Sequence, residues 1–368
     1  MTLGNGAITL SRQGIAVVVI CIGLLLVLEF VGRSMFPPGR PKYWNPVYGT
    51  VQPPNYTAGH YRTNSLGFRG PEISLEKPGG TFRIAFVGGS VVEAVHVKEE
   101  DTFAYQVQQK LYRILKGRPT IEVIIAAGDS RTSHYALSHI VNRILPLDPD
   151  LIIQLDASDM WGTLDPSYEP TMYWKSRPLY GQNTLRQWLK ANSGLFRGIR
   201  RMRDLASREL ASLKGGQSKN AGGASRKLDP PDEVLFRDPQ RPFDNIHRIG
   251  LLTREAGVNY AVMTQAWLYK PELPPEEVKV LRGLQRGGWN MSVDTALRSI
   301  KSYNDSLRRL AMDDDLILID TDRLLPKDLD HYIDDVHLTA RGHEVVADAI
   351  VHALMQEDDM AWIIPDSI

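Results

Sequence analysis

Cysteine is almost absent from this sequence. The 368 residues include one cysteine, Cys21, so no disulfide can form within the chain and no cluster of thiolates is available to bind a metal. With no disulfide to interpret, the sequence leaves the redox compartment of the protein open.

An excess of charge of either sign is also lacking. Lysine plus arginine and aspartate plus glutamate number 43 each, so the chain as a whole has no field that would favour nucleic acid or an anionic lipid surface. We therefore expect no nucleic-acid partner. The hydrophobic share of 43% and the charged share of 23% are ordinary for a folded soluble domain, and 368 residues fit two average domains or one large α/β domain with additions.

One long hydrophobic run lies near the N-terminus, after a tail of residues 1–13. Residues 14–31 are apolar except for Glu29, and as a helix they would rise about 27 Å, close to the roughly 30 Å of a hydrocarbon core. A cleaved signal peptide is the alternative, but it would have a more basic start than Arg12 alone and an A-x-A cleavage site after the run. We therefore predict an uncleaved transmembrane anchor over residues 14–32.

From Thr81 onward, short apolar runs alternate with helical patterns. The runs predict strands at 83–87, 120–126, 150–155, 258–264 and 316–319. The helical patterns lie at about 102–116, 133–144, 243–256, 294–311 and 340–355. This alternation predicts a parallel sheet with helices on both faces, and right-handed crossovers make a doubly wound, flavodoxin-like sandwich the natural topology.

Two further segments flank or interrupt the α/β domain, which we place at residues 81–358 before a tail of 359–368. Residues 33–80 have no helical or alternating period, and we expect a stalk or a strap laid over the domain. An insertion at 160–240 separates the third and fourth strands, and its middle, residues 185–213, mixes apolar residues at helical spacing with many arginines. Such a helix can lie on an anionic membrane surface, or it can pack as a solvated helix over the domain, which is the plainer interpretation.

The stretch Arg83-Ile-Ala-Phe-Val-Gly-Gly-Ser90 joins a strand to two glycines and a serine. An apolar run that ends in Gly-Gly is typical of a strand buried on both faces of a parallel sheet. The next helical pattern starts only near Thr102, so we expect Ser90 at the carboxyl edge of the first strand, where open α/β sheets bind their ligands. A serine in this place is either a reacting group or a phosphate ligand.

The best candidate for a base that activates Ser90 lies near the C-terminus, in Asp334-Asp-Val-His337. Thr339 fits the N-cap of the last helix, which puts Asp334 and His337 in the loop before that helix, at the same edge of the sheet. An aspartate three residues before a histidine can hold one imidazole nitrogen and leave the other facing a serine. This is the arrangement of nucleophile, base and orienting acid that acyl transfer uses.

Other chemistries fit these residues less well. A Walker loop would need Gly-Lys-Ser/Thr after the strand, and a dinucleotide fingerprint would need a third glycine, which Gly-Gly-Ser-Val-Val-Glu lacks. His337 with Asp334 and Asp335 could bind a metal, but no second cluster of His or Cys in the sequence supports such a site. We therefore expect no cofactor and no metal. Each motif alone is weak, because strands often end in Gly-Gly-Ser and Asp-x-x-His often only caps a helix.

Taken together, the motifs resemble a known family. Gly-Gly-Ser after the first strand and Asp-x-x-His before the last helix resemble the first and last sequence blocks of the SGNH (GDSL-type) hydrolases. The segments 64–70 (NSLGFRG) and 258–269 (VNYAVMTQAWLY) are similar to the corresponding parts of membrane-anchored bacterial members. The resemblance covers most of residues 61–354 apart from the 160–240 insertion.

The resemblance implies a three-layer α/β/α sandwich with a five-stranded parallel sheet, and serine esterase or acyl-transfer chemistry without a cofactor. Ser90 would attack an ester carbonyl, His337 would take its proton, and Asp334 would orient His337.

Membrane-anchored relatives generally face the outside of the bacterial inner membrane and act on acylated glycans or similar esters. This implies a single-pass membrane protein with a periplasmic body, and an acyl-ester substrate that includes carbohydrate esters. The charges around the apolar run lean by a small margin towards a cytoplasmic body instead, because one basic residue precedes it and three follow: Arg12, then Arg33, Arg40 and Lys42.

Two blocks depart from the family pattern and leave a degenerate oxyanion and substrate site. The family's oxyanion donors are the N–H of the nucleophile, here Ser90, a glycine N–H in the second block and an asparagine amide in the third. In this chain the glycine position is Arg131 and the asparagine position is Ser158. Asp156 adds a negative charge near the expected oxyanion, and we predict that it pairs with Arg131. Losing one oxyanion donor typically costs ~10²–10³ in rate.

Two functions therefore remain open. The intact set of Ser90, His337 and Asp334 favours a membrane-anchored serine esterase or O-acyltransferase. The altered second and third blocks favour a catalytically weakened relative that serves as a binding or assembly subunit of a membrane complex, with a membrane protein as its partner.

Overall fold

The structure is a computed structural model. It describes residues 12–36, 43–45, 47–128, 131–156, 159, 185–213, 226–227, 240–281, 289–290 and 292–356. The chain divides into two compact units. We call Met1–Pro41 with Gly181–Gly222 the anchor unit, and Lys42–Tyr180 with Gly223–Ile368 the α/β unit.

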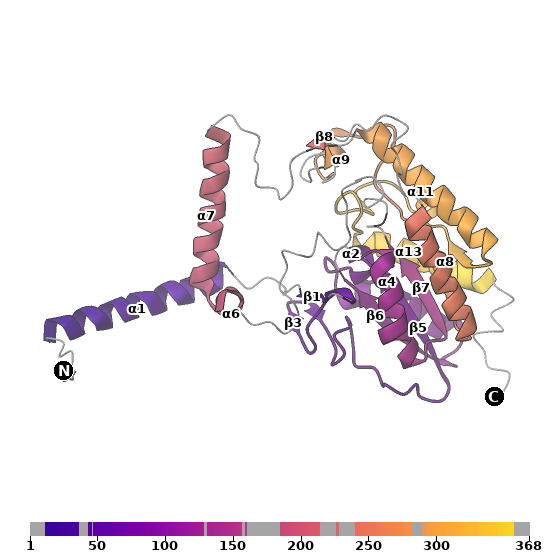
Figure 1. The fold of residues 1–368 in the computed structure, drawn as a ribbon, viewed down its shortest axis with the longest axis horizontal. Coiled ribbons are helices and arrows are strands. Elements are labelled where there is room, and N and C mark those ends of the chain that lie inside the picture. Colours follow the sequence, from indigo (N-terminus) through magenta and orange to yellow (C-terminus); the bar gives the residue numbers. More distant parts are fainter. Residues whose placement is uncertain are drawn as a thin grey trace, which may run out of the picture. The chain divides into compact units, whose positions relative to one another are not determined.

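The α/β unit is built on one parallel sheet. Its strands are β5 (Thr81–Gly88), β6 (Thr120–Ala127), β7 (Leu151–Leu155), β9 (Asn259–Met263) and β11 (Ile317–Ile319). They lie in the order β11-β9-β7-β5-β6, and every neighbouring pair is parallel (Figure 1). This is the strand order of a flavodoxin-like sheet, so the predicted fold class is confirmed. The predicted strand ends agree with the observed ones to within two residues.

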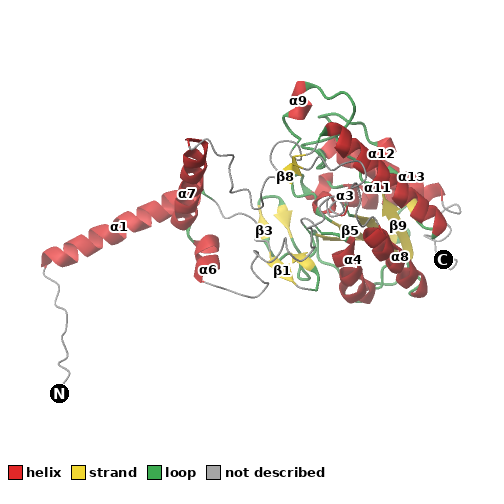
Figure 2. Ribbon diagram, turned by 45° about the horizontal axis from the view of Figure 1, so that its top comes forward, coloured by secondary structure: helices red, strands yellow, loops and turns green. Residues whose placement is uncertain are grey.

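Helices cover both faces of this sheet. On one face α3 (Phe103–Ile114) packs against α13 (Ala340–Gln356). On the other face α8 (Gln240–Glu255) contacts both α4 (Ser133–His139) and α11 (Val293–Asp313). Figure 2 shows the strands between these two helical layers. The three-layer sandwich is therefore the one that the sequence predicts.

Short elements complete the α/β unit. They are the hairpins β1 (Tyr43–Asn45) with β2 (Gly49–Val51) and β3 (Thr57–Ala58) with β4 (Tyr61–Arg62), the pair β8 (Arg226–Lys227) with β10 (Trp289–Asn290), the helices α2 (Ser90–Glu93), α9 (Pro275–Val278) and α12 (Thr321–Leu324), and the turns Glu99–Asp101, Ile140–Ile144 and Leu145–Leu147. The turn Ile140–Ile144 is π-helical and continues α4. The sequence predicted these two segments as one helix.

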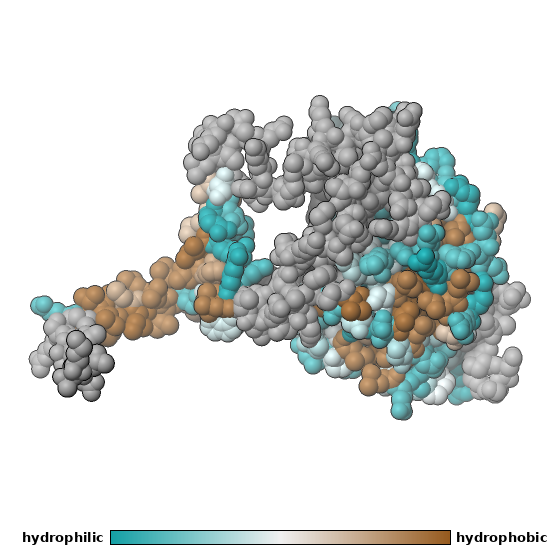
Figure 3. Space-filling model, viewed as in Figure 1, coloured by the Kyte–Doolittle hydropathy of each residue, from teal (hydrophilic) through white to brown (hydrophobic). Residues whose placement is uncertain are grey.

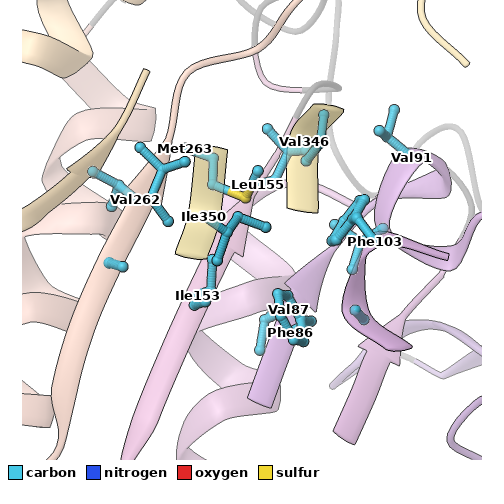
Figure 4. Close-up of a cluster of buried hydrophobic side chains, with 14 of the residues drawn as sticks. Phe86, Val87, Val91, Phe103, Ile153, Leu155, Val262, Met263, Val346 and Ile350 are labelled. Atoms are coloured by element: carbon cyan, nitrogen blue, oxygen red, sulfur yellow. The ribbon is translucent and has the colours of Figure 1, made fainter. Parts of the chain in front are cut away.

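Strand β5 lies inside the sheet between β7 and β6 and is buried on both faces, which explains its apolar run Ile84–Val87. Ile84, Ala85, Phe86 and Val87 are fully buried. Figure 4 shows side chains of the sheet interleaved with Phe103 of α3 and with Val346 and Ile350 of α13. The rings of Phe86 and Phe103 meet edge to face, with centroids 5.6 Å apart. Since burying one such side chain contributes about 1.5–3 kcal/mol, this core fixes the strand that leads to Ser90.

Residues 43–70 form a strap on the α/β unit, with the NSLGFRG segment at its end. The Asn64 side chain accepts hydrogen bonds from the N–H groups of Leu66 and Phe68, both at 3.0 Å, and so closes a tight loop. Gly67 has φ +76°, and a Cβ there would lie 2.7 Å from the Gln52 carbonyl oxygen. The Arg69 N–H then donates to the Ile125 carbonyl of β6 at 3.3 Å. This loop therefore joins the strap to the edge of the sheet.

The anchor unit consists of α1 (Arg12–Met35), α6 (Leu185–Asn192) and α7 (Gly194–Leu213). Within α1, the segment Ile15–Met35 is long and apolar enough to cross a membrane, and it is almost unburied inside the protein. Its exposed apolar side chains give α1 its brown surface in Figure 3. The predicted helix at 185–213 is two helices that meet at Ser193, and α7 packs against α1.

Candidate active site

Ser90 stands where β5 passes into α2, a single helical turn. The Glu93 N–H donates to the Gly89 carbonyl at 3.0 Å, and the Ala94 N–H donates to the Ser90 carbonyl at 2.9 Å. Because Ser90 is the first residue of the turn, its own N–H has no acceptor within the helix. The sequence predicted the next helix only from about residue 102, so this turn corrects that expectation. Ser90 does lie at the carboxyl edge of the sheet, as predicted.

The structure brings together the three residues that the sequence placed at this edge. His337 Nε2 lies 2.8 Å from Ser90 Oγ. On the other side of the ring, His337 Nδ1 lies 2.9 Å from both carboxylate oxygens of Asp334. The result is a continuous hydrogen-bonded chain from a buried carboxylate through an imidazole to a serine hydroxyl.

The loop that carries Asp334 and His337 is closed by its own hydrogen bonds. Asp334 Oδ1 accepts from the N–H groups of Val336 at 3.0 Å and His337 at 2.8 Å, an Asx turn. Thr339 begins α13 as an N-cap, since its Oγ1 accepts from the Gly342 N–H at 3.1 Å. The predicted cap is therefore confirmed, and the loop holds the imidazole in one orientation.

The charge on Asp334 is fixed by its partners. Burial alone would raise its pKa, but hydrogen bonds from the His337 ring and from the N–H groups of His337 and Val336 hold the pKa of Asp334 well below its usual range. Because the Asp334 carboxylate can only accept a hydrogen bond, it favours the tautomer of His337 that carries its proton on Nδ1 and donates from there. His337 Nε2 is then an acceptor for the hydroxyl proton of Ser90.

Two further histidines that the sequence motifs do not include, His96 and His343, lie around His337. His96, exposed in the loop after α2, sets its ring edge to face against His337 with centroids 5.0 Å apart. His343 is fully buried on α13 and accepts the Phe103 N–H at Nδ1 over 3.3 Å. Burial, and then the charges of Arg69, His337 and His96, lower the pKa of His343 to about 3. Only His96 had a signal in the sequence, its position six residues after Ser90.

Arg69 of the strap binds the backbone of the segment that follows Ser90. Its guanidinium is buried and donates to the carbonyls of Glu93 and Ala94, both at 2.5 Å, and to the carbonyl of Val97 at 2.8 Å. These three carbonyls bracket the loop that carries His96. The strap therefore supports the end of the α2 turn and the loop beside His337.

The side chain of Glu93 ties the same turn to the strap a second time. Its Oε1 accepts from Gln52 Nε2 at 2.8 Å and from the Tyr61 hydroxyl at 3.1 Å. Glu93 is almost fully buried at the end of α2. An acidic residue in the apolar run Val-Val-Glu-Ala-Val was the available sequence signal, because a buried carboxylate needs partners.

Arg131, the predicted replacement for the oxyanion glycine, is engaged inside the protein. Its backbone N–H donates to the Gly128 carbonyl at 3.2 Å. Its guanidinium is buried, donates to the Ala126 carbonyl at 2.5 Å and lies 2.7 Å from His139 Nδ1. Both groups that could have served an oxyanion thus have other partners. Ser158, the other substituted position, lies outside the described residues.

The predicted pairing of Arg131 with Asp156 takes the form of a charge interaction between buried groups. Burial, followed by the charge of Asp159, raises the pKa of Asp156 well above its usual range, while Gln154 and Arg131 act in the other direction. Asp159 in turn accepts from the Ser133 N–H at the start of α4, at 3.0 and 3.1 Å. Burial thus works against the negative charge that the sequence suggested at Asp156.

A metal centre has no support in the part of the chain that the structure describes. There, no group of three or more His, Cys, Asp and Glu side chains is placed to bind a metal ion. His337, Asp334 and Asp335, the residues of the alternative metal site, are described and do not form such a group. Instead, the Asp334 carboxylate accepts a hydrogen bond from the His337 ring.

The chain was compared with known protein families, curated proteins and solved structures, and three similar solved structures are described below. No family model matches the chain, and no curated protein matches it in sequence. One similar structure is LAE5, an alpha/beta hydrolase enzyme from the metagenome of Lake Arreo, with 13% identity, a TM-score of 0.42, and coverage of 74% of this chain and 94% of that one. The acetylxylan esterase Axe2 from Geobacillus stearothermophilus has 12% identity, a TM-score of 0.42, and coverage of 77% and 97%.

The third is a putative GDSL-like lipase from Parabacteroides merdae, with 12% identity, a TM-score of 0.44, and coverage of 77% and 98%. The likeness concerns the fold. The α/β/α sandwich itself rests on the strand order and the parallel pairing of this chain.

Proposed function

We propose that the α/β unit is a serine esterase or acyl-transfer enzyme of the SGNH type, with Ser90 as nucleophile, His337 as general base and Asp334 as the group that orients the base. The observation that supports it is the chain of hydrogen bonds from Asp334 through His337 to Ser90, at 2.9 and 2.8 Å. Nucleophile and base within hydrogen-bond reach, with the base held by a third group, is the arrangement that activates a serine.

The proposed reaction has two halves. Ser90 Oγ attacks the ester carbonyl while its proton passes to His337 Nε2, and the carboxylate of Asp334 stabilises the imidazolium that forms. His337 then gives that proton to the departing alcohol, which leaves an acyl group on Ser90. A water molecule takes the acyl group in a hydrolase, and a second alcohol takes it in a transferase, by the same steps in reverse.

The oxyanion site departs from the SGNH pattern at two of its three donor positions. The Ser90 N–H, at the first position of α2, is one donor that the fold supplies. Arg131 and Ser158 occupy the second and third oxyanion-donor positions of the family pattern. We expect them to contribute less to oxyanion stabilisation than a glycine N–H and an asparagine amide would. A slow enzyme is the expected consequence, since each missing donor costs ~10²–10³ in rate.

The alternative is a binding or assembly subunit with little or no catalysis. It is favoured by one observation, the engagement of the Arg131 N–H and guanidinium with Gly128, Ala126 and His139. Under this alternative the same edge of the sheet would hold a partner or an ester without cleaving it.

We further propose that α1 anchors the protein in a membrane and that the α/β unit lies on the periplasmic side. The length and apolar surface of α1 support the anchor, and the resemblance to membrane-anchored SGNH hydrolases supports the side and an O-acylated glycan as substrate. Protease treatment of intact spheroplasts tests the orientation. Loss of the α/β unit supports a periplasmic body, and its full protection contradicts one.

Labelling with a fluorophosphonate tests the catalytic proposal. The full chain in detergent is treated with the probe, and the adduct is located by peptide mapping. We expect an adduct on Ser90 in the native chain, none in Ser90→Ala, strongly slowed labelling in His337→Ala, and unchanged labelling in Ser65→Ala, which changes an exposed serine of the strap. No adduct on a chain whose melting transition is intact contradicts the enzyme and favours the binding subunit. With an adduct in hand, release of acetate from acetylated oligosaccharides tests the substrate class.

A further inference from the structure

The insertion helices α6 and α7 belong with the membrane helix. The carboxylate of Glu29 on α1 accepts from the Ser193 hydroxyl at 2.7 Å and from the N–H groups of Gly194 at 2.9 Å and Leu195 at 3.1 Å. Glu29 therefore caps the N-terminus of α7, where the first backbone N–H groups have no acceptor within the helix. The one acidic residue of the apolar run is thereby explained.

Two glycines let the helices touch backbone to backbone. A Cβ on Gly32 would lie 2.6 Å from the Gly194 carbonyl carbon, and a Cβ on Gly194 would lie 2.0 Å from the backbone nitrogen of Arg33. Arg33 donates to the Asn192 carbonyl at 2.8 Å, so the end of α6 is bonded to α1 as well. The contact is thus close and specific, and it lies in the last two turns of α1.

The direction of α7 places it along a membrane surface. Figures 1 and 2 show that α7 runs across the end of α1 instead of alongside it. A helix that crosses the end of a membrane-spanning helix lies in the plane of the headgroups. Its 20 residues would extend about 30 Å in that plane.

One face of α7 is apolar and open. Ile199, Met202 and Leu205 recur every third residue and are 53%, 62% and 53% exposed. In Figure 3 the hydrophobic residues of α7 lie on the side of the helix towards which α1 extends, and the hydrophilic ones lie on the other side. The apolar face is thus turned towards the region that the hydrocarbon core around α1 would occupy. In α6, Leu185 and Trp188 are exposed too, at 74% and 57%.

The positive charge of this unit is local. The chain as a whole has equal numbers of basic and acidic residues, whereas residues 194–207 of α7 contain four arginines and one acidic residue. An open pocket of about 360 Å³ is lined mainly by these cations and one from α6: Lys190, Arg197, Arg200, Arg201, Asp204 and Leu205. Basic groups beside an apolar helix face are the chemistry that holds an amphipathic helix on anionic lipid.

We propose that α6 and α7 form an interfacial arm that lies on the membrane next to α1, with Ile199, Met202 and Leu205 in the lipid and with Arg200 and Arg201 on the phosphates of anionic phospholipids. Arg197 and Arg203 have partners within the anchor unit, the Phe36 and Lys190 carbonyls and the Asp204 carboxylate. The proposal rests on the membrane span of α1 and is independent of the chemistry at Ser90. It commits the surface to one partner, an anionic bilayer. This makes the first of the two alternatives for the 185–213 segment the better one.

Site-specific labels on the full chain in liposomes test this arm. Cys21→Ser removes the only native cysteine, and Met202→Cys or Asp204→Cys then carries an environment-sensitive fluorophore on the apolar or the polar face of the same turn. The liposomes contain phosphatidylcholine alone or mixed with phosphatidylglycerol. Spin-labelled lipid quenches fluorophores in the bilayer, and acrylamide quenches those in water.

We expect the label at position 202 to be quenched several-fold more by spin-labelled lipid than the label at 204, and to be protected from acrylamide. The difference should be larger with phosphatidylglycerol and should shrink when Arg200→Gln and Arg201→Gln are added. The matched control is Arg113→Gln with Arg309→Gln, which removes the same charge from exposed positions of α3 and α11 and should change nothing.

Equal quenching at positions 202 and 204 by both agents overturns the proposal. The proposal is also overturned if quenching by spin-labelled lipid at position 202 depends neither on the lipid charge nor on the two arginines, because the arm would then not recognise an anionic surface. A label at 202 that is shielded from acrylamide but not reached by spin-labelled lipid also overturns it, and indicates a protein partner on this face.

Discussion

The guanidinium of Arg69 and the carbonyl oxygen of Ala94 lie 2.5 Å apart, at the residue where the turn carrying Ser90 ends. Ala94 has φ +51° and ψ +40°, a left-handed conformation that a residue with a side chain adopts at a cost. The bond from Arg69 is one of the contacts that hold this conformation in place. A residue of the strap thus helps to set the geometry of the proposed nucleophile.

Replacing Arg69 should therefore lower the stability of the α/β unit. Arg69→Lys keeps the charge but cannot reach all three carbonyls, and we expect it to lower the free energy of unfolding by about 2–4 kcal/mol because buried hydrogen bonds to a charged group are lost. Arg62→Lys is the control in the same strap. Its ion pair with Glu99 is 2.7 Å long but half exposed, so the change should stay below about 1 kcal/mol. Urea unfolding measures both, and similar losses for the two variants would contradict the assigned role of Arg69.

Gly88, two residues before the proposed nucleophile, should be irreplaceable. A Cβ on Gly88 would lie 2.2 Å from the Leu155 carbonyl oxygen and 2.6 Å from a methyl group of Val92. Gly88→Ala should therefore push β5 and β7 apart and cost at least about 2–3 kcal/mol, as overpacked cores do. Gly79→Ala, where the new methyl group meets nothing within 4 Å, should be neutral or slightly stabilising. Thermal melts of the two variants decide, and a tolerated Gly88→Ala would mean that the strands can separate freely here.

The orienting carboxylate should matter for rate more than for folding. Asp334→Asn replaces an acceptor by a group that can donate to His337 Nδ1, which favours the wrong tautomer of the ring. We expect the rate of fluorophosphonate labelling to fall by roughly 10³–10⁴ with the melting temperature little changed. Asp330→Asn, an exposed acid in the same loop, should label at the native rate. Equal effects of the two substitutions would remove Asp334 from its proposed role.

The buried His343 should make the fold sensitive to acid. Its pKa is lowered to about 3 in the folded state from the ordinary 6.5, so between these values the unfolded chain binds a proton that the folded chain does not. Stability that is fully present above pH 6.5 is then lost as the pH falls towards 3, by up to about 1.4 kcal/mol per pH unit for one such group.

His343→Phe tests this pH dependence. The variant loses the acceptor for the Phe103 N–H, so it should be less stable at pH 7. It should nevertheless lose less additional stability than the native chain between pH 6.5 and 4. Urea midpoints at several pH values measure the two slopes. Parallel slopes would show that His343 does not contribute, and the buried His139, whose pKa burial also lowers, would be the next residue to change.

The strands and the cap of α13 could be predicted because they depend on local signals. A strand buried on both faces has to be an unbroken apolar run, and Thr339 stands directly before an amphipathic helix. The meeting of Ser90 with His337 was also predictable, since parallel strands bring their carboxyl ends to one edge.

The features that were missed depend on tertiary contacts or on very short elements. The turn α2 has four residues, too few for any periodicity to show. The hydrogen bonds of Arg131 to the Gly128 and Ala126 carbonyls could not be predicted from the sequence, because the partners of an arginine depend on its burial and not on the residue type. The cap that Glu29 provides for α7 joins residues separated by 164 positions or more, and no local pattern encodes such a pair.

The distance along the chain between Ser90 and His337 sets a condition on when this protein can act. The two residues stand 247 positions apart, with the proposed nucleophile directly after β5, the first strand of the parallel sheet along the chain, and the proposed base just ahead of α13, the last helix that the structure describes. A chain growing from its N-terminus carries the serine long before the imidazole that would activate it. Under the proposed mechanism the nascent protein would therefore be inert towards esters around it, and reactivity at Ser90 would report that α13 has docked.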